Sequence, residues 1–201
     1  FIPCGYSRQV WRRSELNSMV GDPATFGIIT VSDRASDGEY EDEGGPAILG
    51  FFKEAVQSSW THHQRIVKDE RDIISATIIE MVDELGCDVV VTTGGTGPAL
   101  RDVTPEATED ACERLLPGFG EQMRAISLKF VATAILSRQL AGLRGSSLIF
   151  NLPGRPKAIR ETIDEIWRAV PYCIDIIGGP YIEMNRNICD DFRPKDARRS
   201  E

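Results

Sequence analysis

Asp88-Val89-Val90-Val91-Thr92-Thr93 runs directly into Gly94-Gly95-Thr96-Gly97. Three valines followed by two threonines make a β-branched run with no polar alternation, which is typical of a strand buried on both faces of a parallel sheet. The glycines lack Cβ atoms, so the backbone can adopt positive φ angles there and approach a ligand closely. Successive exposed N–H groups in such a loop bind anions. We therefore predict a central parallel strand with a phosphate-binding loop at its carboxyl end.

Short β-rich runs alternate with helical periods on both sides of this stretch. We expect strands at residues 26–31, 64–68, 88–93 and 147–151, with helices starting near Pro46, from 70 to 85, from Thr104, and along Ile159, Ile163, Ile166 and Val170. Thr104-Pro105 is interpreted as a hydroxyl N-cap followed by proline in the first turn. Residues 119–145 are interpreted as helix with turns. The alternation predicts an α/β fold, a three-layer αβα arrangement with a mostly parallel sheet.

The 201 residues divide into three parts in this interpretation. Residues 1–22 are expected to be an extension without fixed structure, residues 23–184 a single ligand-binding domain, and residues 185–201 a polar C-terminal tail. The arginines of the first part leave open an organelle-targeting function.

Composition limits the classes of partner. The net charge of −8 argues against nucleic acid, which selects basic surfaces. No apolar run reaches the roughly 20 residues that span a bilayer, so we expect a soluble, cytoplasmic protein with no membrane partner. The five cysteines form no CxxC pair, which is typical of reduced thiols rather than of a disulfide framework or a zinc site.

Four segments rich in polar residues and glycine each follow a predicted strand directly: Ser32-Asp33, Asp69, residues 94–102 and 151–154. Because parallel strands end at the same edge of a sheet, and ligands of open α/β sheets bind beyond that edge, we expect these segments to converge. The loop has no GxxxxGK[ST] pattern, so it is not a Walker A sequence. A tight strand-to-helix connection remains the alternative explanation for its glycines.

Two carboxylates belong to this group, Asp69 and Asp102. Two carboxylates beside nucleotide phosphates suit Mg²⁺, which prefers octahedral oxygen ligands. The alternatives are that Asp69 caps the following helix and that Asp102 is a solvated loop residue. Cations flank the same segments and would hold phosphates: Arg34, Lys68, Arg101, Arg138, Arg155 and Lys157. We interpret His62 and His63 as structural or solvent-facing, because they begin a strand away from its carboxyl end.

Several ordered motifs together resemble the molybdopterin adenylyltransferase family, which includes the bacterial single-domain enzymes and the G domains of the plant molybdenum-cofactor protein and of gephyrin. The motifs are Ile29-Thr30-Val31-Ser32-Asp33-Arg34, Thr92 to Asp102 continuing to Thr108, Pro117-Gly118-Phe119-Gly120-Glu121, Ala134-Ile135-Leu136-Ser137-Arg138 and Asn151-Leu152-Pro153-Gly154. The resemblance covers roughly residues 26–183. The stretch between Ile163 and Val170 is shorter than in the bacterial enzymes, and residues 1–22 have no clear counterpart.

This resemblance implies a MogA/MoaB-like molybdopterin-binding fold and a reaction in which the terminal phosphate of molybdopterin attacks the α-phosphorus of Mg-ATP. It implies that Asp69 and Asp102 are the essential catalytic and metal-binding aspartates. It places nucleotide and pterin contacts at Ser32, Asp33, Thr93, Gly94, Gly95, Thr96, Gly97, Arg101, Ser137, Arg138, Asn151, Pro153 and Gly154. It also implies a homotrimer and a downstream molybdenum-insertion enzyme as partner.

Two other functions remain open at this point. One is a non-catalytic pterin-binding scaffold, because the related domain of gephyrin also organises receptors. The other is a nucleotide hydrolase, since the competence-damage-inducible proteins share this domain type. Those proteins tend to carry a run of acids after the loop, whereas here Leu100-Arg101 precedes the single Asp102.

Overall fold

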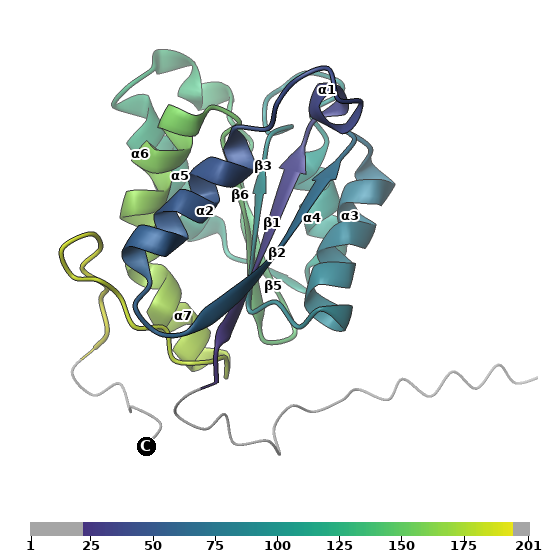
Figure 1. Ribbon diagram of the computed structural model, residues 1–201. Coiled ribbons are helices and arrows are strands. Elements are labelled where there is room, and N and C mark those ends of the chain that lie inside the picture. The colour runs from purple at the N-terminus through teal and green to yellow at the C-terminus, as the bar shows by residue number, and fades with distance from the viewer. Residues whose placement is uncertain (1–21, 195–201) are drawn as a thin grey trace, which may run out of the picture.

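The computed structural model describes residues 22–194, which form a six-stranded sheet between two layers of helices (Figure 1). The sheet has the order β2-β1-β3-β6-β5-β4, in which β2, β1, β3 and β6 are parallel and β5 runs antiparallel to both of its neighbours. The strands are β1 (Ala24–Val31), β2 (Trp60–Val67), β3 (Val89–Thr93), β4 (Arg114–Leu115), β5 (Ala141–Arg144) and β6 (Ser147–Leu152).

Helices cover both faces of this sheet. One layer contains α2 (Gly44–Ala55), α5 (Pro117–Leu128), α6 (Pro156–Ile166), η4 (Trp167–Ala169) and α7 (Val170–Ile176), and the other contains α3 (Arg71–Ile79), continued by the π-helix η2 (Glu80–Glu84), and α4 (Thr104–Ala111) (Figure 1). The short helices α1 (Asp33–Ser36) and η3 (Ala132–Leu136) follow β1 and α5. The predicted three-layer αβα architecture with a mostly parallel sheet is confirmed.

Each face of the sheet has its own hydrophobic core. Under α2, α6 and η4, an aromatic cluster packs around Trp167, whose ring centroid lies 5.0 Å from that of Phe52 and 5.4 Å from that of Phe51. The opposite core joins Ile74, Ile78 and other residues of α3 and α4 to the sheet. All residues of β3 and β6 are buried, as the uninterrupted apolar run of β3 predicts.

The strands end in register at the edge where the sequence places the site. Val31 of β1 pairs with Val67 of β2, and Thr93 at the end of β3 pairs with both Thr30 and Leu152. The residues that follow these four strands therefore lie along one edge, as parallel strands require.

Two local predictions are wrong. Residues 141–144, expected within a helical segment, form β5. This strand lacks a strand-like alternation, and a side chain at Gly142 would lie 2.6 Å from Sγ of Cys112. The hydroxyl of Thr104 does not cap α4 but donates to the carbonyl oxygen of Gly94 at 2.9 Å, because the glycine loop folds back over the start of that helix.

The described part of the C-terminal tail, residues 185–194, packs against the domain. The backbone N–H of Asn185 donates to Ala55 O at 2.7 Å, Cys189 is buried, and Arg193 lies over the ring of Tyr181 and pairs with Asp175. The proposed extension, apart from residue 22, and residues 195–201 lie outside the described residues, and the domain boundaries stay predictions. In residues 22–194, no helix is both long and apolar enough to cross a membrane.

Candidate active site

The glycine loop after β3 is shaped by two residues with positive φ angles, Gly94 at 98° and Gly95 at 60°. A Cβ on Gly94 would lie 2.2 Å from Val31 O, and a Cβ on Gly95 would lie 2.4 Å from Oγ1 of Thr104. The loop therefore lies directly on the end of β1 and on the first turn of α4. Only glycine fits both its backbone conformation and this close approach.

A pair of reciprocal hydrogen bonds joins the ends of β1 and β2. The backbone N–H of Asp33 donates to Oδ2 of Asp69 at 2.8 Å, and the backbone N–H of Asp69 donates to Oδ1 of Asp33 at 3.1 Å. Each carboxylate is thus held by the main chain of the other residue. The prediction that both follow their strands to the same edge is correct in placement. Capping of α3 is not what Asp69 does, since α3 has no side-chain cap.

Asp102 closes the far end of the loop. Its Oδ2 accepts a hydrogen bond from the backbone N–H of Ala99 at 3.0 Å, and its own N–H donates to Ala99 O at 3.0 Å. A Cβ on Gly97 would lie 2.8 Å from this carboxylate, and one on Gly95 would lie 3.1 Å from Oδ1 of Asp69. The two carboxylates therefore border the same glycine loop, one at each side.

Arg101 bridges this loop to both neighbouring strand ends. Its guanidinium donates to Asp33 Oδ2 at 2.7 Å and to Glu70 Oε1 at 2.9 Å. The hydrogen bond from Arg101 lowers the pKa of Asp33 below its ordinary value. Arg101 is more than half exposed and therefore accessible to an anionic ligand. Its surface ion pairs are individually weak, so such a ligand can replace them at little cost in free energy.

Burial raises the pKa of Asp69 above its ordinary value, and the negative charges of Asp33 and Asp102 act in the same direction. The hydrogen bond from the Asp33 N–H and the charge of Arg101 oppose this rise without cancelling it. Asp69 is thus a half-buried carboxylate whose ionised form is disfavoured by its surroundings. A cation placed beside it would stabilise that form.

Asp69→Asn is expected to raise the stability of the ligand-free protein above acidic pH. Because the folded-state pKa of Asp69 is raised, ionisation costs the wild type stability as pH rises from the ordinary carboxyl range through that raised pKa. Asparagine keeps an oxygen for the Asp33 N–H but cannot ionise. Urea unfolding as a function of pH measures the difference, which should vanish at pH 3. A gain that is equal at pH 3 and pH 8 would contradict this explanation.

Other predicted site residues make contacts within the protein. The hydroxyl of Ser32 accepts from Ala35 N and caps α1, and that of Thr93 donates to Pro153 O at 2.7 Å, which ties the loop after β6 to the end of β3. Ser137 Oγ donates to Gln139 at 2.7 Å. A Cβ on Gly154 would lie 3.6 Å from Gly94 Cα, so this loop adjoins the glycine loop.

Asn151, at the end of β6, is buried among polar side chains of the neighbouring elements. Its side chain is fully buried, and its Nδ2 donates to the hydroxyls of Thr92 and Thr108, each at 2.9 Å. Its Oδ1 accepts from Leu140 N at 3.3 Å. These contacts connect β3, α4 and the segment before β5. Ligand contact by Asn151 stays a prediction, while its geometry supports a positioning role.

Asn151→Ala is expected to lower the free energy of unfolding by about 2–3 kcal/mol, because it removes three hydrogen bonds made in the interior, to the hydroxyls of Thr92 and Thr108 and from the N–H of Leu140. Urea denaturation measures the change. Asn187→Ala, at an exposed position, is the control and should stay within about 0.5 kcal/mol of the wild type. Activity lost with stability retained would instead support a direct contact with the ligand.

Three further residues contribute to the site and were not predicted from the sequence. Asp42 accepts hydrogen bonds from Gly44 N and Gly45 N, the first two N–H groups of α2, and from the hydroxyl of Thr30, so it ties the start of α2 to β1. Glu70 and Glu106 pair with the two site arginines. An aspartate two residues before Gly44-Gly45-Pro46 was the available signal for the first; nothing in the sequence pointed to the other two.

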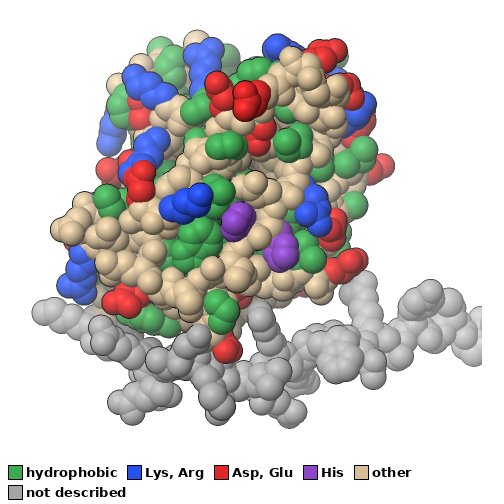
Figure 2. Space-filling view, viewed as in Figure 1, with side chains coloured by type: hydrophobic (Ala, Val, Ile, Leu, Met, Phe, Trp, Pro, Cys, Tyr) green, Lys and Arg blue, Asp and Glu red, His purple; other side chains and the backbone are tan. Residues whose placement is uncertain are grey.

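Three other cations named in the sequence analysis, and both histidines, contact residues outside the glycine loop or lie away from it. Lys68 pairs with Asp37 at 2.8 Å, Lys157 is largely exposed 3.8 Å from Glu161, and Arg34 lies over the ring of Tyr40. On β2, His62 is exposed and His63 half-buried, and both come before the carboxyl end of the strand at Val67. Figure 2 shows two histidine side chains at the surface of this face. The structure gives them no place in the site.

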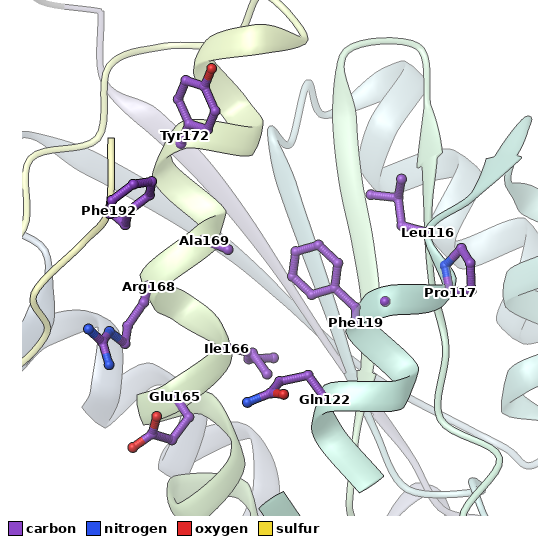
Figure 3. Close-up of a pocket in the computed structure, with 11 residues that line it drawn as sticks. Leu116, Pro117, Phe119, Gln122, Glu165, Ile166, Arg168, Ala169, Tyr172 and Phe192 are labelled. Atoms are coloured by element: carbon purple, nitrogen blue, oxygen red, sulfur yellow. The ribbon is translucent and has the colours of Figure 1, made fainter. Parts of the chain in front are cut away.

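A second depression lies between α5 and the segment from α6 to α7. It has a volume of about 600 Å³, and Figure 3 shows Phe119 and Ile166 near its centre with Tyr172 and Phe192 at one side. None of the predicted site residues lines it. Its lining is mostly apolar, so it is not the anion-binding site described above.

Residues 27–172 match the family described as "Probable molybdopterin binding domain". The chain belongs to this family. Similar members of the molybdopterin-binding family are the molybdopterin adenylyltransferase of Helicobacter pylori, 56% identical over 170 residues that cover 85% of this chain and 97% of that protein, and the molybdopterin adenylyltransferase of Escherichia coli, 49% identical over 186 residues that cover 87% and 95%. The family resemblance of the sequence motifs is thereby confirmed.

Solved structures of the molybdopterin-binding family share the fold. The molybdopterin biosynthesis enzyme MoaB of Thermus thermophilus superposes with a TM-score of 0.70 at 37% identity, covering 79% of this chain and 99% of that one. The expected MogA/MoaB-like fold is therefore confirmed.

Proposed function

We propose that this chain is a molybdopterin adenylyltransferase, which transfers AMP from ATP to the terminal phosphate of molybdopterin and releases pyrophosphate. The observation that carries this proposal is the pair Asp69 and Asp102 at the two sides of a glycine loop. The high identity to adenylyltransferases over nearly their whole length supports it further.

The residues of the chain divide the work of this transfer. The loop of Gly94, Gly95 and Gly97 lets the main chain approach phosphates, and the N-terminus of α4 behind it favours their negative charge. Arg101 offers a guanidinium that can exchange its exposed carboxylate partners for phosphate oxygens. Together these groups would orient the α-phosphorus toward the attacking phosphate and stabilise the charge that develops. The leaving pyrophosphate takes the bonding electrons of the broken P–O bond.

Mg²⁺ fits the residues present. Asp69 Oδ1 accepts no hydrogen bond from residues 22–194, and burial, helped by the charges of Asp33 and Asp102, raises the pKa of Asp69, so that its ionised form is short of a cationic partner. The described residues contain no cluster of three or more His, Cys, Asp or Glu side chains suited to a metal, and Mg²⁺ commonly takes only one or two carboxylates together with substrate phosphates. Asp69 and Asp102 would hold the ion, which would neutralise phosphate charge.

An assay with protein, Mg-ATP and molybdopterin tests the proposal by following pyrophosphate and adenylylated pterin. The expected result is pyrophosphate release that depends on the pterin. ATP hydrolysis without pterin would overturn the proposal in favour of a hydrolase, and tight pterin binding without turnover would favour a scaffold. Neither alternative is favoured by the identities to adenylyltransferases.

We also propose that the chain forms a homotrimer and passes its product to a molybdenum-insertion enzyme. Exposed apolar side chains support an association of subunits, because such groups are commonly covered by partners: Leu100 in the loop after β3, and Phe130, Val131, Ile135 and Leu136 in and just before η3. Light scattering should give three times the chain mass of 22.3 kDa, and a monomer would contradict the trimer.

A further inference from the structure

Arg138 contacts the glycine loop from behind through both its main chain and its side chain. Its N–H donates to Thr96 O at 2.9 Å, and its Nε donates to Gly97 O at 2.8 Å. Its Nη2 donates to the carbonyl oxygen of Asp102, and its Nη1 pairs with Glu106. One residue thus holds three carbonyl groups between positions 96 and 102.

The geometry of these contacts restrains the main chain at Asp102. The guanidinium is a rigid planar fork, so bonds to Gly97 O and Asp102 O fix the distance between the two ends of the loop tip. The tip between them is closed by the two hydrogen bonds between Ala99 and Asp102. The main chain that carries the Asp102 carboxylate is therefore held on one side by Arg138 and on the other by the loop tip.

Glu106 in the first turn of α4 orients the guanidinium. One of its carboxylate oxygens pairs with Arg138, while Oε2 is buried and accepts no hydrogen bond among the described residues. Arg138 is thus the ion-pair partner of a half-buried carboxylate, and both side chains lie beside the loop, each a little more than one-third exposed. Removing Arg138 would leave the Glu106 carboxylate without this ion-pair partner.

We propose that Arg138 is a positioning residue, which sets the geometry of Asp102 by clamping the carbonyl oxygens of Gly97 and Asp102 while Glu106 orients it. This inference rests on the proposed function for its kinetic consequence. It differs from the sequence interpretation, which placed Arg138 in contact with nucleotide or pterin. Three of the five guanidinium N–H groups of Arg138 donate to other residues of the protein. The other two leave direct contact with a ligand as the alternative that the experiment must distinguish.

Arg138→Lys tests the clamp, because lysine keeps the charge but its single ammonium cannot reproduce the three-way fork. We expect kcat for AMP transfer to fall about 100-fold, as for a displaced catalytic group, while KM for ATP and for molybdopterin changes less than about threefold. Amide hydrogen exchange of the ligand-free protein should be about tenfold faster at Ala99 and Asp102, the factor for loss of one charge-assisted hydrogen bond. Exchange in β3 and β6 should not change.

Arg144→Lys is the matched control. Arg144 also contacts a carboxylate, Asp83, at 3.0 Å and a backbone carbonyl, Ala111 O, at 3.1 Å. It pairs with Ser147 at the start of β6, and so lies at the end of the sheet away from the glycine loop. It should leave kcat and loop exchange as in the wild type. Glu106→Gln, which removes the orienting charge, should reproduce the Arg138→Lys pattern more weakly.

Two results would overturn the proposal. A rise in KM for ATP or molybdopterin with kcat retained would make Arg138 a ligand contact, and unchanged loop exchange in Arg138→Lys would show that it holds nothing. If the wild type transfers no AMP, the proposed function fails by itself, and the exchange comparison between Arg138→Lys and Arg144→Lys still decides whether the clamp exists.

Discussion

Asp69→Asn and Asp102→Asn are each expected to lower kcat for AMP transfer by about 1,000-fold, the loss associated with removing a group that stabilises transition-state charge. Both substitutions keep the size of the side chain and an oxygen that can accept the existing hydrogen bonds from Asp33 N or Ala99 N. What they remove is the negative charge on either side of the glycine loop. Pyrophosphate release under saturating ATP and molybdopterin measures the effect.

Asp110→Asn is the control for this pair. Asp110 lies on α4 and pairs with Arg71 on the surface, so its substitution removes one negative charge without changing the site. It should retain activity within about twofold, because an exposed ion pair contributes little. Wild-type turnover in either site variant would show that the transfer does not depend on these carboxylates.

Gly94→Ala is expected to lower the free energy of unfolding by about 3–5 kcal/mol, the sum of a left-handed backbone penalty and an overpacking cost. The residue has a φ angle of 98°, and the added Cβ would meet Val31 O at 2.2 Å. The clash is with backbone on a central strand, so no side-chain rotation relieves it. Urea denaturation gives the loss, and activity should fall with it because the loop must move away from β1.

Gly145→Ala separates the two causes. Gly145 also has a positive φ angle, 56°, but an added Cβ there has nothing within 4 Å. Only the backbone penalty remains, and we expect a loss of about 1 kcal/mol with normal activity. Equal losses at the two positions would mean that the contact with β1 carries no cost and that the loop does not lie as described.

The predictable part of the structure is the part with strong periodicity or a strong local signal. The buried run of β3, the apolar stripe of α3 and the glycines after β3 each specify one local structure, and the parallel arrangement then brings Asp33, Asp69 and the loop to one edge. Family resemblance, not these patterns, identified the pterin.

The remainder depends on tertiary contacts that have no sequence period. β5 is four residues long and is defined by pairing with β6 and β4 rather than by its own alternation. Glu106 behaves like an ordinary first-turn acid until Arg138, 32 positions away, lies beside it. The hydrogen bonds from the buried amide of Asn151 to Thr92 and Thr108 likewise join segments far apart in the sequence, and no sequence pattern indicates them.

The two carboxylates of the site follow strands that differ in local stability. Asp69 follows β2, an edge strand with no buried residue that pairs only with β1 in the described sheet, whereas Asp102 belongs to the loop after the wholly buried β3. Strands of the first kind open locally at a lower free energy than the global transition. A brief detachment of β2 would part the two carboxylates while the centre of the sheet stays intact. Heat would then inactivate this protein before it unfolds it.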